Sequence, residues 1–191
     1  GAGYIGSHMA WALLDAGESV IVLDNFSTGF RWAVPRKARL YEGDVGDNAL
    51  LHRIFLENNV DAVVHFAGSI IVPESVRDPL GYYENNTLKS HCLISAAVEA
   101  RIPRFIFSST AAVYGTPESD EPVSESAKLK PESPYGSSKL MTEIMLRDAA
   151  AAHDLNYTTL RYFNVAGADP FGRTGQSTKG ATHLIKVACE T

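Results

Sequence analysis

Short apolar runs alternate with longer amphipathic stretches along the 191 residues of the chain. The apolar runs predict buried strands, and the stretches with apolar residues at helical spacing predict helices. The predicted strands cover residues 20–23, 61–66, 104–108 and 158–163, with a weaker candidate at 39–42. The predicted helices cover residues 6–15, 47–58, 80–100, 134–153 and 181–191. Asp47 is a plausible N-cap for the second of these helices.

Strands that are apolar throughout and separated by helices are typical of a parallel sheet covered on both faces. The pattern therefore predicts an α/β protein with a doubly wound parallel sheet. Two polar segments, 115–133 and 164–180, are too long to be plain connections. Both follow predicted strands, and ligands of such sheets bind outside the carboxyl ends of the strands. We expect both segments to cover a substrate.

The two ends of the chain interrupt this pattern. Residue 1 lies inside a glycine-rich turn that a preceding strand should feed, and the helix expected at 181–191 has no C-cap. We therefore expect the chain to be part of a longer protein, with a first strand and a C-terminal lobe outside it.

Composition narrows the class of protein. A net charge of -5 argues against a nucleic-acid groove, which needs clustered Lys and Arg. No apolar run is long enough to span a bilayer, and no signal-peptide pattern opens the chain. Cys92 and Cys189 belong to no metal-binding or CxxC pattern, which is typical of reduced thiols in a cytoplasmic protein, and we expect no metal site.

The first six residues, Gly-Ala-Gly-Tyr-Ile-Gly, match the motif G-x-G-x-x-G. Such glycines allow a tight turn, close approach of a pyrophosphate and packing of the next helix, whose free N–H groups meet the phosphates. Asp24 ends an apolar strand 18 residues after Gly6, where a carboxylate accepts the ribose hydroxyls and repels a 2′-phosphate. The pair predicts a dinucleotide site that prefers NAD to NADP, although Arg31 and Arg36 lie nearby. A purely structural turn is the alternative.

Tyr135 and Lys139 are four residues apart and face the same side of the helix predicted at 134–153. Ser133 and Pro134 mark the helix start as N-cap and first residue, so Tyr135 lies in the first turn. The positive helix end and the lysine ammonium should lower the phenol pKa toward neutrality, which suits a base. The alternative is a chance spacing without function.

Ser108, Ser109 and Thr110 end a Phe-rich strand at the edge where ligands bind. A hydroxyl there can hydrogen-bond a reacting alcohol or ketone, whereas an ST-turn that ends the strand is the alternative.

Together these motifs resemble the extended short-chain dehydrogenase/reductase family over the whole chain, and the Gly-Tyr-Ile-Gly-Ser-His opening is similar to UDP-glucose 4-epimerases. The resemblance implies a Rossmann fold, with an NAD-binding domain at 1–163 and the start of a substrate-binding region at 164–191. It makes Thr110, Tyr135 and Lys139 the catalytic residues. The cofactor-binding residues that it implies are Gly3, Tyr4, Ile5, Gly6, Asp24, Asn25, Asp44, Val45, Phe66, Ala67, Gly68, Asn85, Ser108, Tyr135 and Lys139. The substrate-binding residues that it implies are Thr110, Tyr135, Tyr162 and Asn164.

The resemblance further implies a UDP-sugar substrate and a homodimer that pairs helices 80–100 and 134–153. Ala111 and Ala112 stand where sugar dehydratases of the family carry an acid and a base, so epimerisation at C4 is favoured over dehydration. Ile70 stands where several epimerases carry a lysine that touches the cofactor phosphates. Another nucleotide-sugar epimerase, a reductase of the same family and a non-catalytic NAD-binding regulator remain the alternatives.

Overall fold

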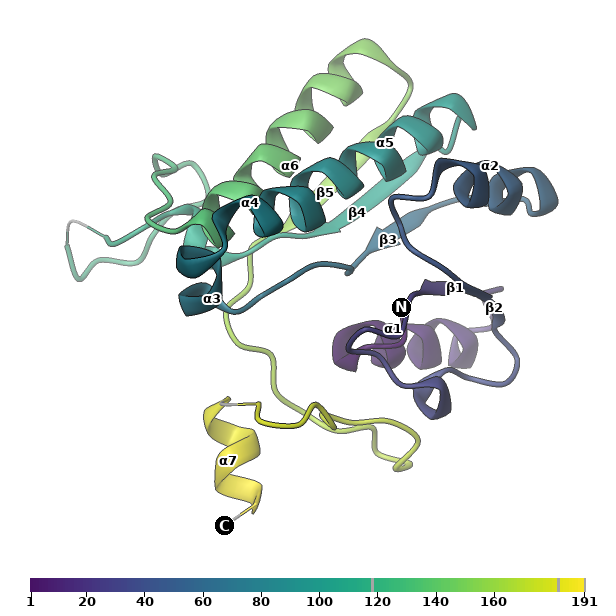
Figure 1. Ribbon diagram of the computed structural model, residues 1–191, viewed down its shortest axis with the longest axis horizontal. Coiled ribbons are helices and arrows are strands. Elements are labelled where there is room, and N and C mark those ends of the chain that lie inside the picture. The colour runs from purple at the N-terminus through teal and green to yellow at the C-terminus, as the bar shows by residue number, and fades with distance from the viewer. Residues whose placement is uncertain (118, 182, 191) are drawn as a thin grey trace. The chain divides into compact units, whose positions relative to one another are not determined.

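Two parallel sheets form the framework of the computed structural model, which describes residues 1–117, 119–181 and 183–190 (Figure 1). The chain divides into two units, Gly1–Asp44 with Asn164–Thr191, and Val45–Phe163. In the part of the chain that the structure describes, no helix is long and apolar enough to cross a membrane.

The first unit carries a two-stranded parallel sheet. Helix α1 (Tyr4–Asp15) leads into strand β1 (Ile21–Asp24), which pairs in parallel with β2 (Arg39–Glu42). The connection between the strands contains the short 3₁₀ helix Arg31–Ala33, and helix α7 (Leu184–Glu190) ends the unit. The helix predicted at 181–191 thus begins at Leu184, and positions 182 and 191 lie outside the described residues.

The second unit carries a three-stranded parallel sheet in the order β3–β4–β5. Its helices α2, α5 and α6 lie side by side (Figure 1). The elements of this unit are α2 (Asn48–Glu57), β3 (Val63–His65), α3 (Val72–Arg77), α4 (Pro79–Tyr82), the π-helical segment Tyr83–Leu88, α5 (Lys89–Glu99), β4 (Arg104–Ser108), the 3₁₀ helix Ala111–Val113, α6 (Pro134–Ala152) and β5 (Asn156–Leu160). The parallel α/β class expected from the hydrophobic pattern is confirmed.

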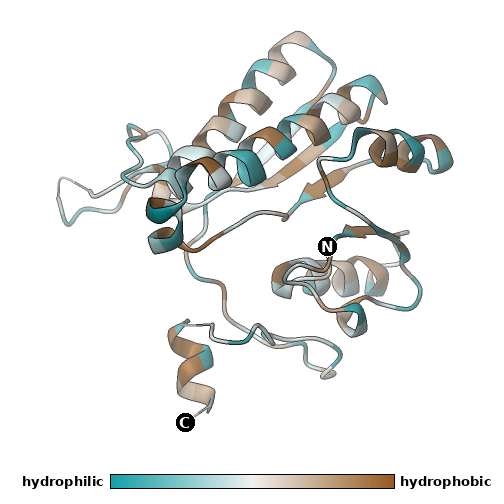
Figure 2. Cartoon of the chain, viewed as in Figure 1, coloured by the Kyte–Doolittle hydropathy of each residue, from teal (hydrophilic) through white to brown (hydrophobic). Residues whose placement is uncertain are grey.

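The core of the second unit lies between its sheet and its helices. Phe105 and Phe107 of β4 are fully buried, and Leu146 of α6 is fully buried as well. Figure 2 shows hydrophobic residues along β3 and β4, as expected for strands covered on both faces. Burying a large apolar side chain stabilises a fold by about 1.5–3 kcal/mol, so these aromatic residues fix β4 firmly.

The sequence signals for helix starts are confirmed at two helices. The Asp47 side chain accepts a hydrogen bond from the N–H of Leu50, at 3.0 Å, and caps α2. The Ser133 hydroxyl accepts one from the N–H of Gly136, at 3.1 Å, and caps α6 directly before Pro134. Tyr135 therefore lies in the first turn of α6, as predicted.

The prediction of one continuous helix at 80–100 is wrong for the middle of this range. Helical structure runs over Pro79–Glu99, but Tyr83–Leu88 adopts a π-helix between α4 and α5. A π turn frees backbone carbonyls, and here the carbonyl oxygen of Asn86 accepts hydrogen bonds from the hydroxyls of Ser90 and Thr142. Hydrophobic spacing cannot reveal this change, because side-chain hydroxyls compensate for it.

The strand predicted at 158–163 is shifted in the structure to Asn156–Leu160. The N–H of Asn156 donates to the carbonyl oxygen of Pro103, which starts the pairing with β4 two residues earlier. The strand ends before Tyr162, whose carbonyl oxygen accepts from the N–H of Ala111 instead of from a strand. The long segments 115–133 and 164–180 contain no helix or strand over their described residues, and position 118 lies outside these.

Candidate active site

The glycine-rich turn at the start of α1 has one open and two crowded positions. A Cβ atom on Gly6 would lie 2.6 Å from the carbonyl oxygen of Gly1, and one on Gly1 would lie 2.6 Å from Cγ1 of Val22. A Cβ atom on Gly3 would meet nothing within 4 Å. Gly3 is also the N-cap of α1 and offers no side-chain cap. The turn therefore packs tightly on its inner side and leaves helix N–H groups accessible beside Gly3, as a pyrophosphate requires.

Asp24 lies at the carboxyl end of β1, close to this turn. Its Oδ2 atom accepts a hydrogen bond from the N–H of Ala2, at 2.7 Å, and Oδ1 accepts from the N–H of Phe26, at 2.8 Å. The Gly1 nitrogen also donates to Oδ2, at 2.8 Å, so of about four lone-pair sites of the carboxylate one is left for a ribose hydroxyl. The Asn25 side chain donates to Asp44 Oδ2 at 3.0 Å, so these two predicted cofactor residues hold each other beside Asp24.

One face of α1 binds the segment that follows Asn164. The Tyr4 hydroxyl donates to the carbonyl oxygen of Gly167 at 2.6 Å, and the hydroxyls of Ser7 and Thr174 share a buried hydrogen bond of 2.6 Å. These contacts attach the segment to the same helix whose first turn carries the glycine motif.

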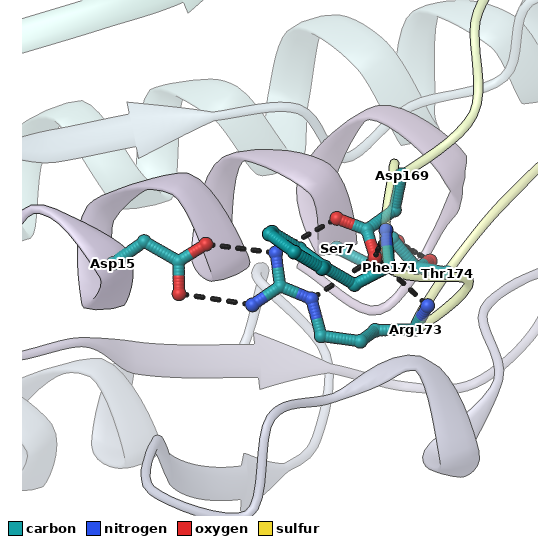
Figure 3. Close-up of polar contacts among 6 residues, drawn as sticks. All are labelled: Ser7, Asp15, Asp169, Phe171, Arg173 and Thr174. Atoms are coloured by element: carbon teal, nitrogen blue, oxygen red, sulfur yellow. Dashed lines mark hydrogen bonds and ion pairs between the residues drawn. The ribbon is translucent and has the colours of Figure 1, made fainter.

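Arg173 completes the attachment of this segment (Figure 3). Its guanidinium forms an ion pair with Asp15 at 2.7 Å and another with Asp169 at 2.7 Å. It also lies 4.3 Å above the ring of Trp11. Hydrogen bonds from Arg173 hold the pKa of the Asp169 carboxyl down, at about 2.

Lys139 lies buried in the second unit, on the face of α6 that also carries Tyr135. Its Nζ atom donates to the carbonyl oxygen of Ser108 at 3.1 Å and lies 5.0 Å from the ring centre of Phe107. Burial lowers the pKa of Lys139 to about 8. The ammonium has three donors, so it can serve Ser108 and ribose hydroxyls together.

Thr110 and Tyr135 meet at the end of β4, as the resemblance implied. The Thr110 side chain lies near enough to the Tyr135 phenol to act on its pKa, and the Thr110 oxygen accepts a hydrogen bond from the N–H of Ala112 at 3.1 Å. The expected lowering of the Tyr135 pKa is wrong for the residues of this chain. Burial raises the pKa of Tyr135, Thr110 opposes that rise, and nearby Tyr162 adds to it. The loss of hydration on burial is therefore the largest effect on this phenol and outweighs the contribution of Thr110.

Tyr162, predicted to bind substrate, lies beside the same edge. Its hydroxyl forms a short hydrogen bond with the hydroxyl of Ser108. Ser108 therefore contacts Tyr162 through its side chain and Lys139 through its carbonyl oxygen. Asn164, the other substrate residue of the prediction, belongs to the first unit and is exposed.

The turn after β3 runs from Phe66 through Ala67 to Gly68, at residues predicted to line the cofactor. A Cβ atom on Gly68 would lie 2.9 Å from Asn86 Oδ1 and 3.2 Å from Lys139 Nζ. The Asn85 side chain donates to the Ser69 hydroxyl at 2.9 Å. The π-helical segment thus aims side chains at this turn.

Asn86 connects the turn to α6. Its Oδ1 atom accepts from the N–H of Ser69 at 2.7 Å, and its Nδ2 atom donates to the Ser138 hydroxyl at 3.0 Å. Sequence reasoning placed Asn86 in the helix but gave it no role. It also missed Tyr82, whose ring packs edge-on against Tyr135 with centres 6.5 Å apart. No spacing signal marks either contact, because each joins residues that are distant in the sequence.

The site residues therefore fall in both units. Gly3, Tyr4, Ile5, Gly6, Asp24, Asn25, Asp44 and Asn164 belong to the first unit, and Val45, Phe66, Ala67, Gly68, Asn85, Ser108, Thr110, Tyr135, Lys139 and Tyr162 belong to the second. Within each unit the contacts bring most of these residues together. The division at 163/164 into an NAD-binding domain and a substrate-binding region stays a prediction.

Comparison with known proteins decides the family. The model of the NAD dependent epimerase/dehydratase family matches residues 1–190. The chain belongs to this family. The UDP-glucose 4-epimerase of Azospirillum brasilense is 60% identical over 190 residues, which are 100% of this chain and 54% of that protein. The chain spans about half the length of the curated relatives that it matches.

Solved structures of family members share the fold. A crystal structure of UDP-glucose 4-epimerase superposes with a TM-score of 0.96 at 43% identity, over 99% of this chain and 57% of that one. The UDP-glucose 4-epimerase from Brucella ovis, in complex with NAD, gives 0.93 at 44% identity, over 98% and 57% of the two chains. The enzyme from Bifidobacterium longum, in complex with NAD⁺ and UDP, gives 0.88 at 39% identity, over 94% and 56%. The fold of the chain is accordingly a Rossmann-like α/β fold.

Proposed function

We propose that the full-length protein that carries this chain interconverts the C4 epimers of a UDP-hexose, UDP-glucose and UDP-galactose, with NAD as its bound cofactor. One observation carries the proposal: Thr110, Tyr135 and Lys139 converge at the end of β4, and the residues that follow Thr110 bear only methyl groups. The relatives named UDP-glucose 4-epimerase, at up to 60% identity, support the same reaction.

The residues of the chain fit NAD in both units. Gly3 leaves room for a pyrophosphate at the start of α1, and Asp24 retains acceptor capacity for the adenosine ribose. Lys139 offers an ammonium to the other ribose. Bound NAD would supply a hydride acceptor for the hydrogen at C4 of the sugar. The glycine turn and Asp24 hold the cofactor, and the second unit performs the proton chemistry.

Each catalytic residue has one role in this scheme. The Tyr135 phenolate takes the proton from the sugar 4-hydroxyl as hydride leaves C4, and returns a proton when the hydride comes back to the other face. The Thr110 hydroxyl, which lies near Tyr135, stabilises the carbonyl oxygen that forms at C4. Lys139 favours the phenolate through its charge. The residues of the chain alone leave the phenol pKa raised, so Tyr135 depends on added positive charge in the complete site.

Dehydration at C5 and C6 needs an acid and a base beside the 4-keto sugar. Ala111 and Ala112 occupy the 3₁₀ turn directly after Thr110 and can donate or accept no proton. Return of the hydride to C4 is then the fastest reaction open to the 4-keto intermediate. A reductase of the same family is the remaining candidate, and it differs in consuming one reduced cofactor for each turnover.

We further propose that the protein forms a homodimer through helices 80–100 and 134–153, in the cytoplasm. The face formed by these helices exposes apolar side chains. Leu88 is 62% exposed, Met141 44% and Ile144 39%. A groove between α5 and α6 is lined by apolar residues such as Ile94, Val98 and Met145 together with polar ones such as His91 and Asp148. Sedimentation of wild type and of Met141→Glu tests this, because a charge at a dimer face should yield monomers.

The test of the reaction uses the full-length protein and UDP-galactose. We expect UDP-glucose to form without added NADH, detected by NMR of the sugar nucleotide. Tyr135→Phe should lower kcat by roughly 10²–10⁴-fold, since it removes a general base and keeps the ring. If the reaction consumed one NADH for each sugar converted, the protein would be a reductase and not an epimerase. If Tyr135→Phe kept full activity, Tyr135 would not be the general base.

A further inference from the structure

Glu143 is a buried charged residue that the proposed chemistry does not use. It is 6% exposed and lies on α6, in register with Tyr135 and Lys139 at intervals of four residues. Side chains at this spacing share one face of a helix. Glu143 therefore extends the line of catalytic side chains by one turn, toward the interior of the unit.

The Glu143 carboxylate binds two partners from different strands. It accepts a short hydrogen bond from the Ser109 hydroxyl, after the end of β4. It also forms an ion pair with Arg161, after the end of β5, with 2.6 Å between Nη2 and Oε2 and 3.0 Å between Nε and Oε1. Such a two-pronged contact fixes the direction as well as the distance of both groups.

Arg161 carries the connection further, into the long segment that follows Thr110. Its Nη1 atom donates to the Tyr114 hydroxyl at 3.0 Å and to the carbonyl oxygen of Glu125 at 3.2 Å. Its guanidinium also lies 5.1 Å from the ring centre of Tyr114. The ends of β4 and β5 and the segment 111–133 thus meet at one ion pair.

Both direct partners of Glu143 are next to a residue of the proposed site. Ser109 directly precedes Thr110, and Arg161 directly precedes Tyr162. A buried ion pair contributes little net stability, because desolvation of both charges offsets their attraction. Its geometry, in contrast, is specific. The network is therefore better suited to fixing positions than to stabilising the fold.

We propose that Glu143 is a positioning residue for the C4 chemistry: through Ser109 and Arg161 it holds Thr110 and Tyr162 in place against Tyr135. The proposal rests on the proposed function. Its consequence is a loss of kcat without loss of cofactor affinity, because no partner of Glu143 holds the glycine turn or Asp24. Displacement of a catalytic group by about 1 Å can cost on the order of 10²-fold in rate.

The test uses the full-length protein with Glu143→Gln, which keeps the shape of the side chain and removes its charge. We expect kcat with UDP-galactose to fall by about tenfold or more. The NAD dissociation constant should stay at the wild-type value, so that the loss appears in kcat and not in cofactor binding. Glu57→Gln, which loses an exposed ion pair with Arg53 on α2, serves as the matched control and should keep full activity.

A double-mutant cycle separates positioning from loss of folding. Ser109→Ala leaves the Glu143–Arg161 ion pair intact and removes only its link toward Thr110. It should lower kcat too, and Glu143→Gln should cost little more in a Thr110→Ala protein, since the group that it positions is gone. If Glu143→Gln does not fold, Ser109→Ala carries the test.

The outcomes are distinguishable. Wild-type kcat in folded Glu143→Gln or in Ser109→Ala, or additive losses in the cycle, would overturn the positioning role while the epimerase function stands. A wild-type protein that shows no epimerisation would overturn the proposed function and this role with it.

Discussion

Gly68 and Lys139 approach so closely that a Cβ atom at position 68 would lie 3.2 Å from the lysine Nζ atom. The same Cβ atom would lie 2.9 Å from Asn86 Oδ1. The backbone at Gly68 has φ +155°, which residues with side chains rarely adopt. The absence of a side chain at Gly68 therefore leaves room beside this turn for both Lys139 Nζ and Asn86 Oδ1.

Gly68→Ala should weaken NAD binding and lower kcat, because its methyl group displaces Lys139 or Asn86. The strained backbone should also cost about 1–3 kcal/mol of stability. Gly17→Ala is the control: it has φ +87°, but its Cβ would meet nothing within 4 Å. Thermal melts and NAD titrations of both variants check this. Equal NAD affinity of the two would contradict the crowding argument.

Lys139 should make stability depend on pH in an unusual direction. Burial lowers its folded-state pKa from the ordinary 10.5 to about 8. Between these values the unfolded chain binds more protons than the folded one, so the folded state gains stability as pH rises through this window. Below pH 8 the burial penalty is fully present.

Lys139→Met removes this penalty and keeps a side chain of similar size. Without cofactor, the stability of wild type relative to the variant should therefore rise as pH increases from 8 toward 10.5, by about 1.4 kcal/mol for each unit of pKa displacement. Urea unfolding at several pH values measures it, with exposed Lys128→Met as control. A difference between wild type and Lys139→Met that does not vary with pH would rule out the charged buried lysine.

The fold was largely predictable from the sequence, but its interruptions were not. Strand 104–108 was predicted to the residue because Phe105 and Phe107 are buried and apolar. The π-helical segment at Tyr83–Leu88 was not, because hydroxyls of Ser90 and Thr142 from two different helices satisfy the carbonyl of Asn86. The hydrophobic pattern of a segment indicates which of its residues are buried. It does not indicate which hydroxyls from other helices will bond a carbonyl that a π-helix leaves free, because that depends on tertiary packing.

The placement of the three predicted catalytic residues at one strand end was predictable, and their electrostatics were less so. Thr110, Tyr135 and Lys139 converge as expected, since strand ends and helix starts meet at one edge. The Tyr135 pKa was predicted in the wrong direction, because burial cannot be read from spacing. Glu143 could have been noticed, as it continues the four-residue spacing of Tyr135 and Lys139, but its partner Arg161 is distant in sequence.

Asp24 should make the protein prefer NAD to NADP. Its carboxylate suits a ribose diol and opposes a phosphate, and like charges at contact cost several kcal/mol, so we expect a preference of more than about tenfold. Dissociation constants for both cofactors, in wild type and in Asp24→Ala, measure this. The preference should shrink in the variant. Equal wild-type affinity for the two cofactors would show that Asp24 does not read the ribose.

Arg173 should hold the segment 167–174 on α1. Arg173→Met removes both ion pairs, with Asp15 and Asp169, and keeps an apolar side chain beside Trp11. Thermolysin should then cleave this segment several-fold faster, because Phe171 is 76% exposed and its backbone loses its anchor. Arg147→Met, at an exposed pair with the adjacent Asp148, is the control. Unchanged cleavage of Arg173→Met would show that Tyr4 and Ser7 hold the segment without it.

The central claim is that hydride leaves C4 of a UDP-hexose and returns to the same carbon without loss of water. The most direct measurement follows UDP-galactose deuterated at C4 of the hexose, incubated with the full-length protein, by NMR and mass spectrometry of the product. Tyr135, Thr110 and the methyl groups of Ala111 and Ala112 predict UDP-glucose of unchanged mass that retains deuterium at C4. A product lighter by one water, or an epimer whose deuterium has been lost to solvent, would contradict the account.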